Sequence, residues 1–198
     1  GCFFYPYIRL FYMKPSTFDK EKTQVLLLYP KTGMDFGSTV APPHALLAVA
    51  APLLKAGYKV KILDQRVESV TKEVLQREIS SDLICVGIST MVGTQLYFAL
   101  SLAKMVRRIT DGKIPIVWGG CQPSVIPEHT VKNKNVDYVV IGEGDLTLLE
   151  MVKAWEHKRP LDDVAGIMFK NGSEIIKTSD RPLMDIEELL PVPWELVN

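Results

Sequence analysis

The chain has 198 residues, of which 47% are hydrophobic, so it is long enough for one domain with a substantial core and is not expected to be disordered. Lysine plus arginine number 23, as do aspartate plus glutamate, and the net charge is zero. The absence of a basic stripe or a polybasic run argues against nucleic acid and anionic lipid, and favours a small molecule or a protein partner.

Residues 1–22 are interpreted as an N-terminal extension that packs locally or on a partner. Its aromatic opening stretch contains Pro6 and Arg9, is too short to span a bilayer, and lacks the basic start and cleavage site of a signal peptide. Three widely spaced cysteines, at positions 2, 85 and 121, have no metal-ligand spacing. These features predict a cytoplasmic protein without a membrane span.

The first predicted unit begins with a short apolar run at 24–30, which is typical of a strand covered on both faces. A polar, glycine-containing loop follows at 31–42. Apolar residues at helical spacing then predict a helix over 43–57, with Pro43 in its first turn and Gly57 at its C-terminal cap.

The same alternation repeats through the rest of the chain. The second and third units are a strand at 58–64 with a helix at 67–80, and a strand at 82–89 with a helix at 92–110. The fourth and fifth are a strand at 114–118 with a short helical turn near 125–132, and a strand at 136–141 with a helix at 144–157.

Five strand-then-helix units predict an α/β fold, in which helices cover both faces of a doubly wound, Rossmann-like or flavodoxin-like parallel sheet. We expect five strands in the order 2-1-3-4-5.

The pattern changes after residue 160. Two apolar runs flank Asn171-Gly172, a dipeptide that strongly favours a β-hairpin turn. We therefore divide the chain into the extension 1–22, an α/β domain at 23–160, a C-terminal β-hairpin appendix at 161–182, and a proline-containing linker at 183–198.

In a doubly wound sheet the ligand lies beyond the carboxyl ends of the strands. Glycines and small polar residues follow three of the predicted strands, at 89–93, 119–124 and 142–144. Glycine lets a flat or bulky group lie directly on the backbone, and the hydroxyl groups of Ser89 and Thr90 suit a buried polar ligand atom. Tight turns and helix capping are the alternative reasons for these residues.

Several specific chemistries are excluded. No G-x-G-x-x-G follows the first strand, and the loop KTGMDFGST has the wrong spacing for a Walker A motif. A phospho-receiver domain needs acidic residues where this chain has Tyr29, Pro30 and Ser89. We assign no catalytic residue and no metal ligand, so the chain by itself is predicted to be a non-catalytic binder.

Four blocks, in this order, resemble the N-terminal cobalamin-binding domain of cobalamin-dependent (class B) radical S-adenosylmethionine enzymes. They are PPHALLAVAAPLLKAGYKVKILD, VGISTMVGTQ, VWGGCQPSVIPE and DYVVIGEGDLTLLEMV. The resemblance covers roughly residues 23–198, and RPLMDIEELLPVPWELVN is similar to the family's connector into the radical domain.

The resemblance implies a cobalamin with its corrin ring over the carboxyl edge of the sheet and its nucleotide tail beside the central strands. Gly119 and Gly120 would leave room for the tail, so Gly120→Val is expected to abolish cobalamin retention without unfolding. The implied cofactor-binding residues are Ser89, Thr90, Met91, Val92, Gly93, Gly119, Gly120, Gln122, Pro123, Ser124, Gly142, Glu143 and Gly144. The segment 89–93 would line the tail or the lower corrin face, and the others would contact the corrin amides and the nucleotide.

Two departures qualify the resemblance. Mutase-type cobalamin domains carry D-x-H-x-x-G after the first strand, whereas no histidine stands between Lys31 and Pro43. We therefore expect base-off cobalamin without a protein histidine ligand. The C-x-x-x-C-x-x-C motif that holds a [4Fe-4S] cluster is also missing, so this chain cannot itself cleave S-adenosylmethionine.

The missing motif leaves two alternatives: a free-standing cobalamin binder, or a larger enzyme in which a C-terminal radical domain supplies the cluster and the S-adenosylmethionine site. We expect the larger enzyme. Methyl transfer is the expected reaction of that enzyme, with cyclisation as another reaction of the family. Two other functions stay open: a flavodoxin-like domain that binds a flavin or another nucleotide, and a ligand-free interaction module that uses the aromatic N-terminus.

Overall fold

The structure is a computed structural model, which describes residues 22–33 and 40–197. Its centre is one sheet of seven strands in the order β2-β1-β3-β4-β5-β6-β7. The strands are β1 (Val25–Tyr29), β2 (Val60–Asp64), β3 (Cys85–Ser89), β4 (Ile116–Gly119), β5 (Tyr138–Val140), β6 (Ile167–Asn171) and β7 (Glu174–Lys177). The first five are parallel and have the predicted order, while β6 and β7 are antiparallel.

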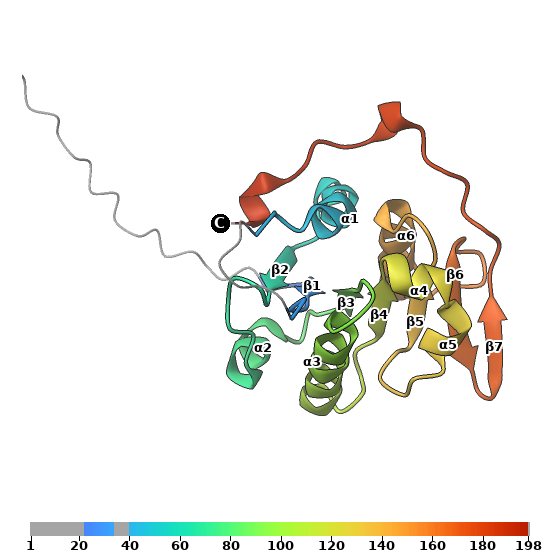
Figure 1. Cartoon of the computed structure of the whole chain (residues 1–198). Coiled ribbons are helices and arrows are strands. Elements are labelled where there is room, and N and C mark those ends of the chain that lie inside the picture. The colour runs from blue at the N-terminus through green and yellow to red at the C-terminus, as the bar shows by residue number, and fades with distance from the viewer. Residues whose placement is uncertain (1–21, 34–39, 198) are drawn as a thin grey trace, which may run out of the picture.

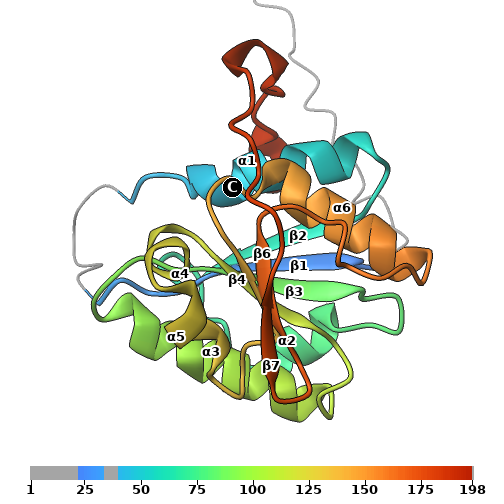
Figure 2. The ribbon, with the colours of Figure 1, turned by 90° about the vertical axis from the view of Figure 1, so that its right-hand side faces the viewer.

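Helices cover both faces of the sheet (Figures 1 and 2). One face is covered by α1 (His44–Lys55) and α6 (Asp145–Glu156), and the other by α2 (Lys72–Glu78), α3 (Gln95–Ile109) and α5 (Pro127–Val131). The short helix α4 (Cys121–Val125) follows β4 directly. The helical turn predicted near 125–132 corresponds to α5, whereas α4 was not predicted.

The continuous apolar run of β1 follows from this two-sided cover. Val25 and Leu27 pack under α1 and α6, whereas Leu26 and Leu28 pack toward α2 and α3. Successive strand side chains point to opposite faces, so a strand between two helical layers needs apolar residues at every position. All four side chains are buried.

The hairpin is part of the main sheet, which corrects the expectation of five strands with a separate appendix. Strand β6 pairs with β5 through Val139↔Met168 and Val140↔Ile167, and Ile167 is fully buried. The hairpin thus extends the sheet beyond β5, with β6 antiparallel to it and β7 at the edge.

The C-terminal segment packs on the domain. After β7 it runs across α6 and α1 toward β2 (Figure 1) and contains two short 3-10 helices, η1 (Ile186–Glu188) and η2 (Trp194–Leu196). The rings of Trp194 and His44 pack edge to face, with their centroids 5.3 Å apart. Val192 and Val197 contact the core. Its role as a linker stays a prediction.

The extension 1–22 lies outside the described residues, apart from Lys22. Within the described parts of the chain, no helix combines the length and the apolar character that a membrane span requires.

Candidate functional site

A pocket of about 220 Å³ lies between the sheet and the two helices α1 and α6, at the carboxyl ends of β3, β4 and β5. Its floor is apolar and comes from the strands, and its walls carry small residues. The floor side chains are Leu27, Val117 and Val140, with Leu148 from α6. The small wall residues are Ala45, Ala48, Gly87, Gly119, Gly120, Gly142 and Gly144.

The two adjacent glycines at the end of β4, Gly119 and Gly120, have different reasons to be glycine. A Cβ built on Gly119 would meet Val140 at 3.8 Å, an ordinary contact, so the backbone there accepts a Cβ without a clash. Gly120 has φ +101°, and its Cβ would lie 2.5 Å from the carbonyl oxygen of Thr90. The backbone therefore requires glycine at 120 whether or not a ligand binds.

This geometry corrects the expectation for Gly120→Val. A valine at 120 would strain the turn and collide with the backbone of Thr90, so a loss of binding there could not be separated from a loss of folding. Gly119 is the position at which an added side chain would enter the pocket without opposing the fold.

Six of the predicted site residues line the pocket together: Ser89, Gly119, Gly120, Gly142, Glu143 and Gly144. Two others, Thr90 and Ser124, hold the surrounding loops. The amide of Thr90 donates to Gly119 O at 2.8 Å. The Ser124 hydroxyl donates to Gly120 O at 2.9 Å and accepts from the Gly142 amide at 3.0 Å, which ties the loops after β4 and β5 together.

The side chain of Gln122 is turned inward rather than toward the pocket. Gln122 and its neighbour Pro123 are buried, and the Gln122 amide donates to the Thr130 hydroxyl at 3.4 Å. Its Oε1 atom is buried and has no hydrogen-bond partner among the described residues.

The remaining predicted residues, Met91, Val92 and Gly93, form an exposed rim after β3. Met91 and Val92 are 49% and 72% exposed, and Gly93 has φ +83°. These three residues lie outside the pocket.

Sequence reasoning missed the wall that α1 supplies. Ala45, Ala48 and Val49 lie three and four positions apart and so share one helix face. Small residues at this spacing were the available signal. Gly87 was missed as well, although a glycine inside a buried strand marks a close approach; its Cβ would meet Leu27 at 2.8 Å.

Two carboxyl groups stand at the start of α6. Burial, and next the nearby Glu143 carboxylate, raise the pKa of Asp145 above its ordinary value. Glu143 accepts a hydrogen bond from the backbone amide of Met184 at 3.2 Å. Both side chains lie where they could accept hydrogen bonds from amide donors of a ligand.

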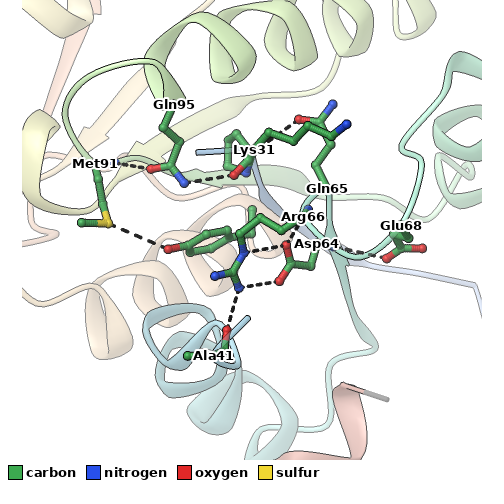
Figure 3. A network of polar contacts seen from close by, with 10 residues as sticks. Lys31, Ala41, Asp64, Gln65, Arg66, Glu68, Met91 and Gln95 are labelled. Carbon is green, nitrogen blue, oxygen red and sulfur yellow. Dashed lines mark hydrogen bonds and ion pairs between the residues drawn. The ribbon is translucent and has the colours of Figure 1, made fainter. Parts of the chain in front are cut away.

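A polar network joins the loops after β1, β2 and β3 (Figure 3). The Arg66 guanidinium forms an ion pair with Asp64, with 2.6 Å between nitrogen and oxygen. Its central carbon lies 4.1 Å from the centroid of the Tyr29 ring. The Gln95 side chain accepts from the Met91 amide and donates to Pro30 O. The strand ends are thus held in place by side chains from three elements.

No group of three or more histidine, cysteine, aspartate or glutamate side chains in the described residues could hold a metal ion. Burial raises the pKa of the Cys85 thiol to about 12, which makes it a core residue rather than a nucleophile. Cys121 is free and exposed.

Comparison with known proteins gives one family and several relatives. Residues 37–152 match the model of the B12 binding domain. The chain is 28% identical over 174 residues to an anaerobic magnesium-protoporphyrin IX monomethyl ester cyclase of Synechocystis, covering 86% of this chain and 34% of that protein. It is 30% identical over 175 residues to an uncharacterized methyltransferase of Pyrococcus horikoshii, and this match covers 86% of this chain and 38% of that protein. The chain thus spans about a third of the length of these curated relatives.

Solved structures share the fold. The radical S-adenosylmethionine methyltransferase TsrM of Kitasatospora setae, with cobalamin and a [4Fe-4S] cluster bound, matches with a TM-score of 0.67 at 22% identity, over 80% of this chain and 31% of that one. The cobalamin-dependent radical S-adenosylmethionine enzyme OxsB, with aqua-cobalamin and S-adenosylmethionine bound, also matches with a TM-score of 0.67. The identity is 21%, and the match covers 82% of this chain and 23% of that one.

Proposed function

This chain belongs to the B12-binding domain family, and from that premise we propose that it binds cobalamin as one domain of a larger radical S-adenosylmethionine enzyme. The cofactor is held base-off, with its nucleotide tail in the pocket under α1 and α6 and its corrin ring over the carboxyl edge of the sheet. Ser89, Gly119, Gly142, Glu143 and Gly144 contact it. Its location is the cytoplasm, in keeping with the free cysteines.

The observation that carries the proposal is the room at Gly119. The pocket is apolar at its floor and lined by glycine and alanine where larger side chains would fill it, and the packing of the chain leaves Gly119 free to carry a side chain. A flat aromatic base suits such a space. The carboxyl groups of Glu143 and Asp145 at its mouth suit the amide donors that a corrin ring carries.

The absence of a histidine ligand is part of the proposal. The loop 31–43 contains no histidine. His44 follows it, and its ring packs against Trp194 of the C-terminal segment. The other two histidines are His129 in α5 and His157 at the end of α6.

The whole protein's reaction is proposed from its relatives. Bound cobalamin supplies the methyl group or the electron, while the residues of this chain bind and orient the cofactor. Methyl transfer is the favoured reaction because one relative is named a methyltransferase, and cyclisation is the second candidate because another is a cyclase. The cluster and S-adenosylmethionine belong to a C-terminal radical domain, the proposed partner of this chain.

The test is cofactor retention. The chain is mixed with hydroxocobalamin, desalted, and its visible spectrum recorded; retained absorbance with a base-off band is expected. Retention of FMN without cobalamin would favour the flavodoxin-like alternative, and retention of neither would favour an interaction module.

A pair of variants places the ligand. Gly119→Val should keep the melting temperature and lose cobalamin, because the valine fills the pocket. Ala56→Val is the matched control, since Ala56 is exposed at the far end of α1 and should bind normally. Full retention by folded Gly119→Val would contradict the proposed site.

A further inference from the structure

Two side chains meet at the point where the strand order reverses. In the order β2-β1-β3, successive strands are added on opposite sides of β1, so the crevice of a doubly wound sheet lies between the ends of β1 and β3. Tyr29 ends β1 and Met91 stands just after β3. The Tyr29 hydroxyl donates to Met91 Sδ at 3.9 Å across this crevice (Figure 3).

The Tyr29 ring is fixed from behind. The Arg66 guanidinium lies over it at 4.1 Å, and Arg66 donates from Nε and a terminal nitrogen to the two oxygens of Asp64, at 3.0 and 2.6 Å. It also donates to Ala41 O at 2.9 Å. The side chains of Arg66 and Asp64 are only 10% and 8% exposed, so this support is buried, bidentate and rigid.

Met91 is fixed through its backbone. Its amide donates to Gln95 Oε1 at 2.6 Å, and the Gln95 amide nitrogen donates to Pro30 O at 3.0 Å. Gln95 is buried at the start of α3. One glutamine therefore sets the loop after β1 against the loop after β3 and determines how far apart Tyr29 and Met91 lie.

We propose that the Tyr29–Met91 pair is the protein surface directly beneath the cobalt of the bound cofactor, where it offers a phenol and a thioether in place of a nitrogen ligand. The inference rests on the proposed function. The nucleotide tail of cobalamin leaves the lower face of the ring, so a tail inserted at Ser89 and Gly119 turns that face toward the edge of the sheet. The neighbouring crevice at β1 and β3 then lies under the ring.

The pair also suits that position chemically. The phenol proton is directed to the sulfur, and neither group carries the imidazole nitrogen that binds metals most commonly in proteins. Their fixed contact keeps the space occupied.

A gain of ligation tests the inference. Tyr29→His and Met91→His each place an imidazole at the crevice. Each variant is loaded with cobalamin, reduced to cob(II)alamin and measured by electron paramagnetic resonance, with and without uniform ¹⁵N labelling of the protein. We expect the cobalt lines to gain a nitrogen splitting that changes from a triplet to a doublet on labelling. Wild-type protein should lack it.

Tyr97→His is the matched control, because Tyr97 is 74% exposed on α3 and should leave the spectrum unchanged. Folded histidine variants that retain cobalamin without a label-sensitive splitting would overturn the inference, as would that splitting in wild-type protein or in the control. So would loss of cobalamin from both folded variants, because a position under the cobalt should accept an imidazole. Should wild-type protein retain no cobalamin at all, the proposed function itself fails.

Discussion

Gly119 and Gly120 illustrate how one residue type can satisfy two independent constraints. The sequence shows only that two glycines follow a strand. Only Gly120 would bring a Cβ too close to the Thr90 carbonyl oxygen. The position of that carbonyl is set by the pairing of Ser89 with Gly119 in neighbouring strands. Because that pairing joins residues thirty positions apart, local sequence patterns do not contain it.

We predict that Gly120→Val destabilises the domain in the absence of any ligand. The variant combines a left-handed backbone with a contact of 2.5 Å to Thr90, and strain of this kind costs on the order of 1–3 kcal/mol. Chemical denaturation of the ligand-free protein measures it. Gly119→Val is the comparison and should unfold close to the wild-type midpoint; equal destabilisation of both would refute the distinction.

A second residue-level prediction concerns Tyr58, far from the pocket. Its hydroxyl donates to Glu156 at 2.5 Å, and burial, with Glu156 next, raises the pKa of Tyr58 from 10.0 to about 12. The folded state thus keeps the phenol proton when the unfolded state has lost it. The stabilisation is complete below pH 10 and is lost as the pH rises from 10 to 12.

Unfolding free energies at several pH values between 9 and 12 test this sign. Near neutral pH, the unfolding free energy of the wild-type protein should exceed that of Tyr58→Phe by about 1 kcal/mol. This difference in unfolding free energy should shrink above pH 10. A difference that grows with pH would contradict the assignment. Tyr97→Phe, at an exposed position, should leave the profile unchanged.

At the scale of elements, periodicity predicted the five strands and the four main helices, and the doubly wound fold class predicted the parallel strand order. Each of these elements has a local signal: continuous apolar runs for strands between two layers, and a 3.6-residue apolar stripe for helices. The hairpin was also recognised, from Asn171-Gly172. Its attachment to β5 was missed, because the pairing of Tyr138 with Phe169 is long-range and a turn signal says nothing of the partner strand.

The docked hairpin leads to an element-level prediction. Ile167→Ala should destabilise the whole domain by about 2–5 kcal/mol, since its side chain is fully buried in the core cluster under α1 and α6 and its backbone pairs with Val140. Ile175→Ala is the control on the same hairpin, where the residue is only partly buried, and it should cost clearly less. A separate appendix would instead give no loss in the main unfolding transition, as followed by circular dichroism and tryptophan fluorescence.

At the scale of the molecule, two hydrophobic layers enclose the sheet, and the pocket interrupts only the layer made by α1 and α6. The fold class was predictable because composition and alternation constrain it. The walls of the pocket were only partly predictable. Glycine marks a close approach by its type, whereas the spacing of Ala45 and Ala48 shows a shared helix face but not that this face lines a pocket beside the end of β3.

The packed C-terminal segment gives a prediction for the molecule as a whole. Deleting residues 181–198 should lower the melting temperature, because Val192, Leu196 and Val197 cover part of the α1–α6 core. The far-ultraviolet spectrum should still be that of a folded domain. Leu183→Ala should have no effect, since Leu183 is 86% exposed. An unchanged melting temperature after the deletion would mean that the segment is not held.

The same segment has a mechanical consequence. Its attachments stand in series, from the ion pair of Arg181 with Glu150 to the ring contact of Trp194 with His44. Tension on the carboxyl terminus, as in an optical trap, would first load the contacts of Val197 and Leu196 with the core and then the ring contact of Trp194, so the attachments would break one after another. The freed segment would have a contour length of about 60 Å, at roughly 3.4 Å per residue, and it would extend before any β-ladder bears load, so a pull on the carboxyl terminus would be taken up before it reached the pocket.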